Sequence, residues 1–60
     1  MHQECYYIFD RLLNKQISDF YCSYSDMLQV FLMFIEQFDS DETVININGN
    51  FSSRFLICNI

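Results

Sequence analysis

The residues best suited to chemistry in this 60-residue chain are one histidine and three cysteines. His2, Cys5, Cys22 and Cys58 form a Cys3His set of the type that binds structural zinc, and zinc often stabilises small domains. Zinc modules usually place their ligands in closely spaced pairs, but only His2 and Cys5 lie close together here. Because cysteine is often buried as a small apolar residue, we interpret the thiols in that way and predict no cofactor. A zinc-stabilised module is the alternative, and the sequence leaves open whether the thiols are metal ligands.

Other candidates for a metal site or for catalysis lack essential residues. Asp39 and Asp41 have the spacing of the first two ligands of an EF-hand loop, but Val44 and Asn50 stand where that loop needs a glycine and a bidentate glutamate. The single histidine has no neighbouring group that would orient it as a base, and one glycine cannot form a phosphate-binding loop. We therefore predict that the chain is not an enzyme.

A group of acidic residues is the remaining candidate site. Four carboxylates lie within seven residues of sequence, and these are Glu36, Asp39, Asp41 and Glu42. No lysine or arginine occurs between Lys15 and Arg54. Glu36 and Asp39 fall near the expected end of a helix, where the helix dipole disfavours negative charge. Negative charges that destabilise the helix end, with no basic residue nearby in sequence to offset them, indicate a function. We therefore predict that these four residues form a contact surface for a basic partner. The alternative is a solvated loop that only keeps the chain soluble.

Charge and cysteine usage restrict the partners and the compartment. Three Lys and Arg residues against eight Asp and Glu residues leave a formal net charge of −5, too few cations to neutralise several phosphates. We therefore expect no direct binding to nucleic acid. The first residues lack the basic charge of a secretory signal, and the longest apolar run, residues 30–35, is far shorter than the roughly twenty residues of a membrane span. With an odd number of widely spaced cysteines, these features predict a cytoplasmic protein that is not in a membrane.

Hydrophobic periodicity predicts two helices before residue 40. Over about residues 4–20, apolar residues recur at steps of three and four, and these are Cys5, Phe9, Leu12, Leu13, Ile17 and Phe20. A second helix is expected over about residues 24–38, where Ser23 and Asp26 have the spacing of a capping box. The second helix is apolar on nearly every side, so we expect it to be buried on more than one face.

A β-hairpin is expected over about residues 43–60. Residues 44–48 alternate apolar and polar side chains and are rich in β-branched residues, and Asn48-Gly49-Asn50 has the chemistry of a turn. A three-residue loop that pairs Ile47 with Phe51 would gather apolar side chains on one face. We therefore favour that register over a two-residue turn.

These elements predict one α+β domain over residues 1–60, in which a two-helix hairpin is followed by a two-stranded antiparallel β-hairpin (ααββ). A two-stranded sheet is marginal in water, so the hairpin must pack on the helices, extend in an oligomer, or both. We interpret the chain as a small acidic interaction domain, an inhibitor or adaptor of the kind that phages and mobile elements use as antagonists. Its partner would be a larger basic protein, such as one that handles nucleic acid. The alternative is an obligate homo-oligomeric module, in its simplest form a homodimer.

Overall fold

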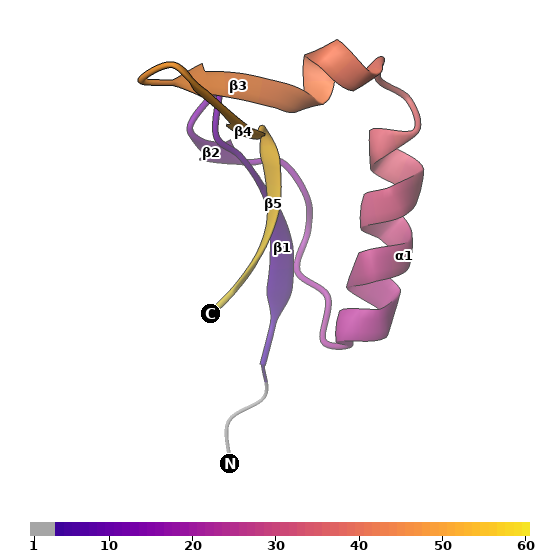
Figure 1. Cartoon of the computed structure of the whole chain (residues 1–60). Coiled ribbons are helices and arrows are strands. Elements are labelled where there is room, and N and C mark those ends of the chain that lie inside the picture. The colour runs from indigo at the N-terminus through magenta and orange to yellow at the C-terminus, as the bar shows by residue number, and fades with distance from the viewer. Residues whose placement is uncertain (1–3) are drawn as a thin grey trace.

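The computed structural model describes residues 4–60 and shows one α-helix, one short 3-10 helix and five strands in two sheets (Figure 1). In chain order the elements are β1 (Tyr6–Asp10), β2 (Lys15–Gln16), α1 (Tyr24–Ile35), η1 (Ser40–Thr43), β3 (Val44–Ile47), β4 (Asn50–Ser53) and β5 (Phe55–Asn59). The first sheet has the order β2-β1-β5, and the second contains β3 and β4; all pairs are antiparallel. The domain is α+β as predicted, but the ααββ order is wrong.

The helix predicted over residues 4–20 is replaced by β1, a turn and β2. Residues 6–9 are two tyrosines, an isoleucine and a phenylalanine, which favour extended backbone. Pairing with β5 covers the whole of β1, from Tyr6 opposite Asn59 to Asp10 opposite Phe55. This long-range pairing overrides the helical spacing, and Leu12, which the helix would bury, lies in the turn with 60% of its surface exposed.

The second predicted helix is confirmed as α1, which ends at Ile35 rather than at about residue 38. Ser23 is its N-cap, and the Ser23 hydroxyl accepts a hydrogen bond from the Asp26 N–H at 3.4 Å. One side of α1 packs on the first sheet, where Met27 is fully buried. The opposite side is exposed, including Leu28, Leu32 and Met33, so the expectation of burial on more than one face is wrong.

The core between α1 and the sheet is small and largely aromatic. Its buried apolar residues are Ile8, Met27 and Phe55. The rings of Phe34 and Phe38 pack around Phe55, with centroids 4.9 and 5.1 Å from the Phe55 ring. Such ring contacts add directional packing to apolar burial and hold the end of α1 against β5.

The β3–β4 hairpin forms at the predicted position but in another register. Ile47 pairs with Asn50, which leaves the two-residue turn Asn48-Gly49. Both turn residues have positive φ, 51° and 85°, as a type I′ turn requires, and Asn-Gly is its preferred sequence. The predicted pairing of Ile47 with Phe51 is wrong because it assumed one buried face. The hairpin instead projects from the rest of the molecule, and Phe51 is 74% exposed (Figure 1).

The chain changes from one sheet to the other at Arg54. Its N–H donates to the Thr43 carbonyl at 2.8 Å, beside the hairpin. Its carbonyl accepts from the Arg11 N–H at 2.8 Å, beside the first sheet. The second half of the hairpin predicted over about residues 43–60 is therefore two strands, of which β4 pairs with β3 and β5 pairs with β1.

The projecting hairpin makes the molecule elongated. Its extents are 42 × 23 × 15 Å, and its Cα radius of gyration is 12.4 Å. A compact chain of this length would have a radius of gyration of roughly 10 Å. Within residues 4–60, no helix combines the length and apolar character needed to cross a bilayer.

Candidate functional site

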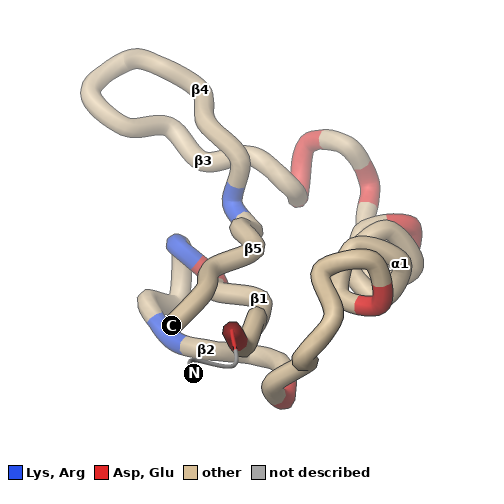
Figure 2. Tube along the Cα trace, turned by 90° about the horizontal axis from the view of Figure 1, so that it is seen from below, with Lys and Arg blue, Asp and Glu red and all other residues tan. Residues whose placement is uncertain are grey.

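The four predicted site residues lie together at the corner where α1 leads through η1 into β3 (Figure 2). Glu36 is the C-cap of α1, Asp39 is the N-cap of η1, and Asp41 and Glu42 lie within η1. All four side chains are exposed. We refer to these four residues as the acidic corner.

Local structure explains part of the acidic corner. A carboxylate oxygen of Glu42 accepts a hydrogen bond from the Asp39 N–H at 2.9 Å, which closes the first turn of η1. Asp41 also lies in that first turn, where negative charge is favourable. Glu36 has the opposite placement, at the C-terminal end of α1. Among residues 4–60, the carboxylates of Glu36 and Asp41 have no hydrogen-bond or ion-pair partner.

The basic side chains do not neutralise the acidic corner. The only ion pair among the described residues joins Arg54 to Asp10, with 3.0 Å between Arg54 Nη2 and Asp10 Oδ2. Arg11 directly follows β1 and its Nη1 donates to the Ser53 carbonyl at 3.2 Å, while Lys15 lies in β2 opposite Asp10; the blue segments of the β1–β2 region are visible in Figure 2. Hydrogen bonding to Asp10 is the main cause that raises the pKa of Arg54, and the charge of the Glu42 carboxylate raises it slightly, but no Lys or Arg side chain of residues 4–60 forms an ion pair with the acidic corner.

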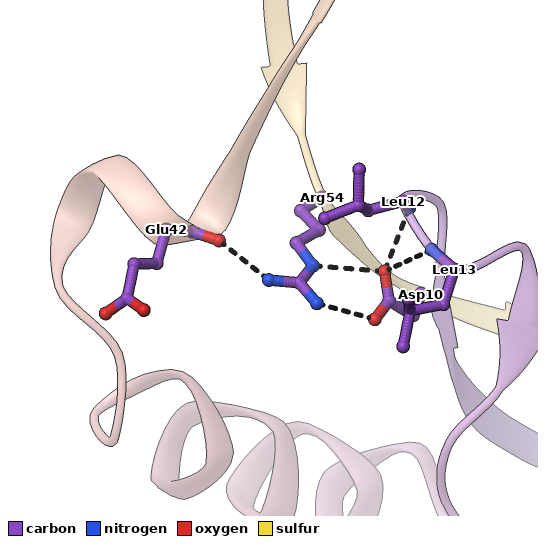
Figure 3. Close-up of polar contacts among 5 residues, drawn as sticks. All are labelled: Asp10, Leu12, Leu13, Glu42 and Arg54. Atoms are coloured by element: carbon purple, nitrogen blue, oxygen red, sulfur yellow. Dashed lines mark hydrogen bonds and ion pairs between the residues drawn. The ribbon is translucent and has the colours of Figure 1, made fainter.

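The Asp10–Arg54 ion pair is the polar centre of the fold, and the sequence analysis missed it (Figure 3). Asp10 is only 1% exposed. Its Oδ1 accepts from Arg54 Nε at 3.1 Å and from the N–H groups of Leu12 and Leu13 at 2.9 and 3.2 Å. Arg54 Nη1 also donates to the Glu42 carbonyl at 3.3 Å. The pair thereby ties β1, the β1–β2 turn and η1 together.

Hydrogen bonding keeps Asp10 ionised inside the fold. The bonds from the Arg54 guanidinium lower the pKa of the Asp10 carboxyl most strongly, while burial raises it and the backbone bonds from Leu13 and Leu12 lower it further. The guanidinium carbon of Arg54 also lies 4.8 Å from the centroid of the Phe55 ring, a cation–π contact. Because each oxygen of Asp10 already accepts hydrogen bonds, we interpret the pair as structural. A lone aspartate after four strand-forming residues and a lone arginine in an apolar segment were its only sequence signals.

Three of the four residues in the Cys3His set, the three cysteines, lie within the residues that the structure describes. Among residues 4–60, no group of three or more His, Cys, Asp and Glu side chains could hold a metal ion. His2 lies outside the described residues. Cys5 and Cys22 are neighbours through the pairing of Tyr6 with Tyr21, whereas Cys58 lies on β5. The zinc-stabilised alternative thus gains no support from the described chain.

An open depression of about 600 Å³ lies beside β2 and is lined by residues between Lys15 and Tyr21. The hydroxyl of Ser18, within this lining, accepts from the Ile8 N–H at 2.8 Å and donates to the Asp19 carbonyl at 3.0 Å. These bonds fix the path of the chain after β2, so the hydroxyl has a structural role.

No protein-family model, curated protein or solved structure matches the chain. The acidic corner is therefore interpreted from its own geometry.

Proposed function

We propose that the chain is a small protein–protein interaction domain that binds a basic surface of a larger protein through the acidic corner. The observation that carries this proposal is four exposed carboxylates, none of which forms an ion pair with a Lys or Arg side chain of residues 4–60. Complementary charge steers such an encounter and selects the partner. An inhibitor or adaptor of a nucleic-acid-handling protein fits this chemistry, because such proteins carry basic surfaces. We place the encounter in the cytoplasm, because an odd number of widely spaced cysteines is not typical of a small secreted domain held by disulfides.

The outward side of α1 adds apolar contact area beside the charge. Leu28, Leu32 and Glu36 follow one another at intervals of four residues, so they form one stripe that ends at the acidic corner. Leu32 and Met33 are 55% and 64% exposed. Specific interfaces combine an apolar centre with a polar rim. The expected binding surface on the partner is thus an apolar patch bordered by Lys and Arg.

The test compares two variants with equal changes of charge. Glu36→Gln with Asp41→Asn removes the two carboxylates without a structural role, and Glu4→Gln with Asp19→Asn removes two exposed carboxylates elsewhere. Cross-linked complexes are recovered from a lysate of the source organism at low and high salt. We expect the first variant to lose recovery of the partner, the control to retain it, and high salt to weaken it.

A second measurement locates the contact without knowledge of the partner. Titration of the labelled protein with a deca-lysine peptide should shift the NMR signals of residues 36–42 more than those around Asp19. Equal loss of recovery in both variants, together with shifts spread over all acidic residues, would show that only total charge matters and would contradict the proposal.

A homodimer through β5 is the second candidate, and a free strand edge supports it. Along an antiparallel strand, the backbone N–H and C=O groups of successive residues point alternately toward the partner strand and away from it. The hydrogen bonds from Arg11 to Arg54 and from Ile60 to Cys5 show which residues of β5 point toward β1. The residues whose backbone groups point away from β1 are therefore Phe55, Ile57 and Asn59. No described residue bonds to that edge, and β5 contains no charge and no proline to block pairing. Two copies would pair antiparallel about a two-fold axis at Ile57 and join their first sheets.

Sedimentation at micromolar concentration tests the homodimer. Asn59→Pro removes an outward N–H and places a ring on the free edge, while the β1–β5 hydrogen bonds remain. We expect a dimer for the unmodified chain and for the matched Asn59→Ala variant, and a monomer for Asn59→Pro. A monomer in all three cases would exclude this candidate.

A further inference from the structure

Two of the three cysteines face each other where the chain enters α1. Tyr6 and Tyr21 form an isolated antiparallel bridge. The Tyr6 N–H donates to the Tyr21 carbonyl at 2.7 Å, and the Tyr21 N–H donates to the Tyr6 carbonyl at 2.8 Å. Because each tyrosine donates to the other, Tyr6 and Tyr21 form a hydrogen-bonded pair of an antiparallel ladder. Hydrogen-bonded and non-hydrogen-bonded pairs alternate along such a ladder, so the next pair, Cys5 and Cys22, occupies a non-hydrogen-bonded position.

Positions of this kind suit a disulfide. Directly opposed residues at a non-hydrogen-bonded position have Cα atoms about 4.5 Å apart and side chains on one face of the ladder. That separation lies at the short end of the range of roughly 4.4–6.8 Å found for disulfides. Partial burial raises the pKa of the Cys5 thiol most, and the neighbouring Cys22 side chain raises it further, as expected for two thiols on one face of the ladder. Cys58 lies on another strand, opposite Tyr7.

We propose that Cys5 and Cys22 are a modification site that forms a reversible disulfide by exchange with small disulfides such as oxidised glutathione. The Cys22 thiolate attacks one glutathione sulfur, which gives a mixed disulfide and releases one glutathione thiolate. The Cys5 thiolate then attacks the Cys22 sulfur and releases the second. Two protein thiols are oxidised, one glutathione disulfide is reduced to two glutathione molecules, and the two protein protons pass to the released thiolates.

Exposure sets the order of the two attacks. Cys22 is exposed, whereas Cys5 is half-buried. Partial burial and the adjacent Cys22 raise the pKa of the Cys5 thiol, which makes its thiolate scarcer. The first attack therefore comes from Cys22, and the opposed position of Cys5 allows it to complete the exchange.

The disulfide would fasten β1 to the start of α1. Cys22 directly precedes Ser23, the N-cap of α1, and the closed loop of 18 residues contains β1, its turn and β2. A disulfide that closes a loop of this size stabilises the fold, because it constrains the unfolded chain. By thermodynamic linkage, folding favours formation of the disulfide by the same free energy. The equilibrium constant with glutathione should therefore be on the order of 100-fold larger in the folded protein than in denaturant.

Glutathione redox buffers and peptide mapping of the full chain test the proposal. Trypsin cleavage after Arg11, Lys15 and Arg54 places each cysteine on its own peptide. We expect oxidation to link peptide 1–11 to peptide 16–54 in a monomer, and dithiothreitol to release them. Cys58→Ser should leave the equilibrium constant unchanged within about threefold, and Cys22→Ser should abolish the intramolecular bond.

Two results would overturn the proposal. One is a dominant linkage through Cys58, either within the chain or between chains. The other is a constant for the Cys5–Cys22 bond that does not fall in denaturant, because the folded structure would then not bring the thiols together. The readout is chemical, so it does not depend on whether the chain has a partner.

Discussion

Replacing Asp10 with asparagine should lower the free energy of unfolding by about 2–4 kcal/mol. Asparagine has nearly the same shape, and its Oδ1 can still accept from the N–H groups of Leu12 and Leu13. The charge opposite Arg54 is lost, and an amide N–H₂ replaces Oδ2, which lies 3.0 Å from Arg54 Nη2. Each hydrogen bond to a charged group contributes about 1.5–3 kcal/mol, of which water recovers a part because the Arg54 side chain is 17% exposed.

Such a loss is large for a domain of this size. A single core of 60 residues rarely supplies more than about 3–5 kcal/mol of stability. At a urea dependence of about 1 kcal/mol per molar, the unfolding midpoint of Asp10→Asn should fall by roughly 2–4 M. Tyrosine fluorescence and circular dichroism follow the transition, because the chain contains four tyrosines and no tryptophan. Arg54→Lys keeps the positive charge but loses the two-pronged geometry, so its midpoint should lie between those of Asp10→Asn and the unmodified chain.

The stabilisation by the Asp10–Arg54 pair should also depend on pH, in a direction that follows from the pKa shift of Asp10. In the folded protein the pKa of Asp10 lies below its ordinary value of about 3.9, mainly because the Arg54 guanidinium hydrogen-bonds to the carboxylate. The stabilisation is therefore complete above about pH 5 and is lost as the pH falls through the folded pKa. The difference between the unmodified chain and Asp10→Asn should narrow below about pH 4. A midpoint change under about 0.5 M, or a difference that stays constant between pH 3 and 6, would refute the assigned role of the pair.

Three further substitutions test the fold. Gly49→Ala should destabilise the hairpin by about 1 kcal/mol, because φ is +85° although a Cβ would meet nothing within 4 Å; an unchanged melting temperature would contradict the type I′ turn. Met27→Ala should cost about 2–5 kcal/mol in urea unfolding, since Met27 is 0% exposed, while Leu28→Ala next to it should stay within about 0.5 kcal/mol; equal losses would place the core elsewhere. Ser23→Ala should cost about 0.5–1 kcal/mol and reduce helix content by circular dichroism, and no change would argue against the N-cap.

Local signals account for the parts of the fold that could be predicted. α1 begins after Ser23 because a capping hydroxyl and helical apolar spacing occur in the same short segment. The strand at Val44 follows from alternating β-branched residues. The turn at Asn48-Gly49 was recognised, but its register was assigned from an apolar face that the projecting hairpin does not bury.

Long-range pairing accounts for what was missed. β1 is a strand because β5 pairs with it from the other end of the chain, and no local window contains that information. The helical spacing over residues 4–20 depended on Leu12 and Leu13, which the structure places in an exposed turn. The acidic corner could be located because its four residues lie within seven residues of sequence. The ion pair of Arg54 with Asp10 could not be predicted, because the two residues are distant in sequence.

The Asp10–Arg54 pair also determines which charges a partner meets. The pair is neutral and mostly buried, so it removes one of the three basic residues and one of the eight acidic residues from the surface. The two basic residues that remain are Arg11, at the start of the β1–β2 turn, and Lys15, in β2. The surface is therefore strongly negative, and its two remaining basic residues are not part of the acidic corner. In the binding that we propose, the acidic corner would attract a basic partner and Arg11 and Lys15 would repel it, so the field would orient the encounter before any contact forms. This orientation requires Arg54 to stay inside the fold, which makes the stability of the ion pair a condition for the proposed binding.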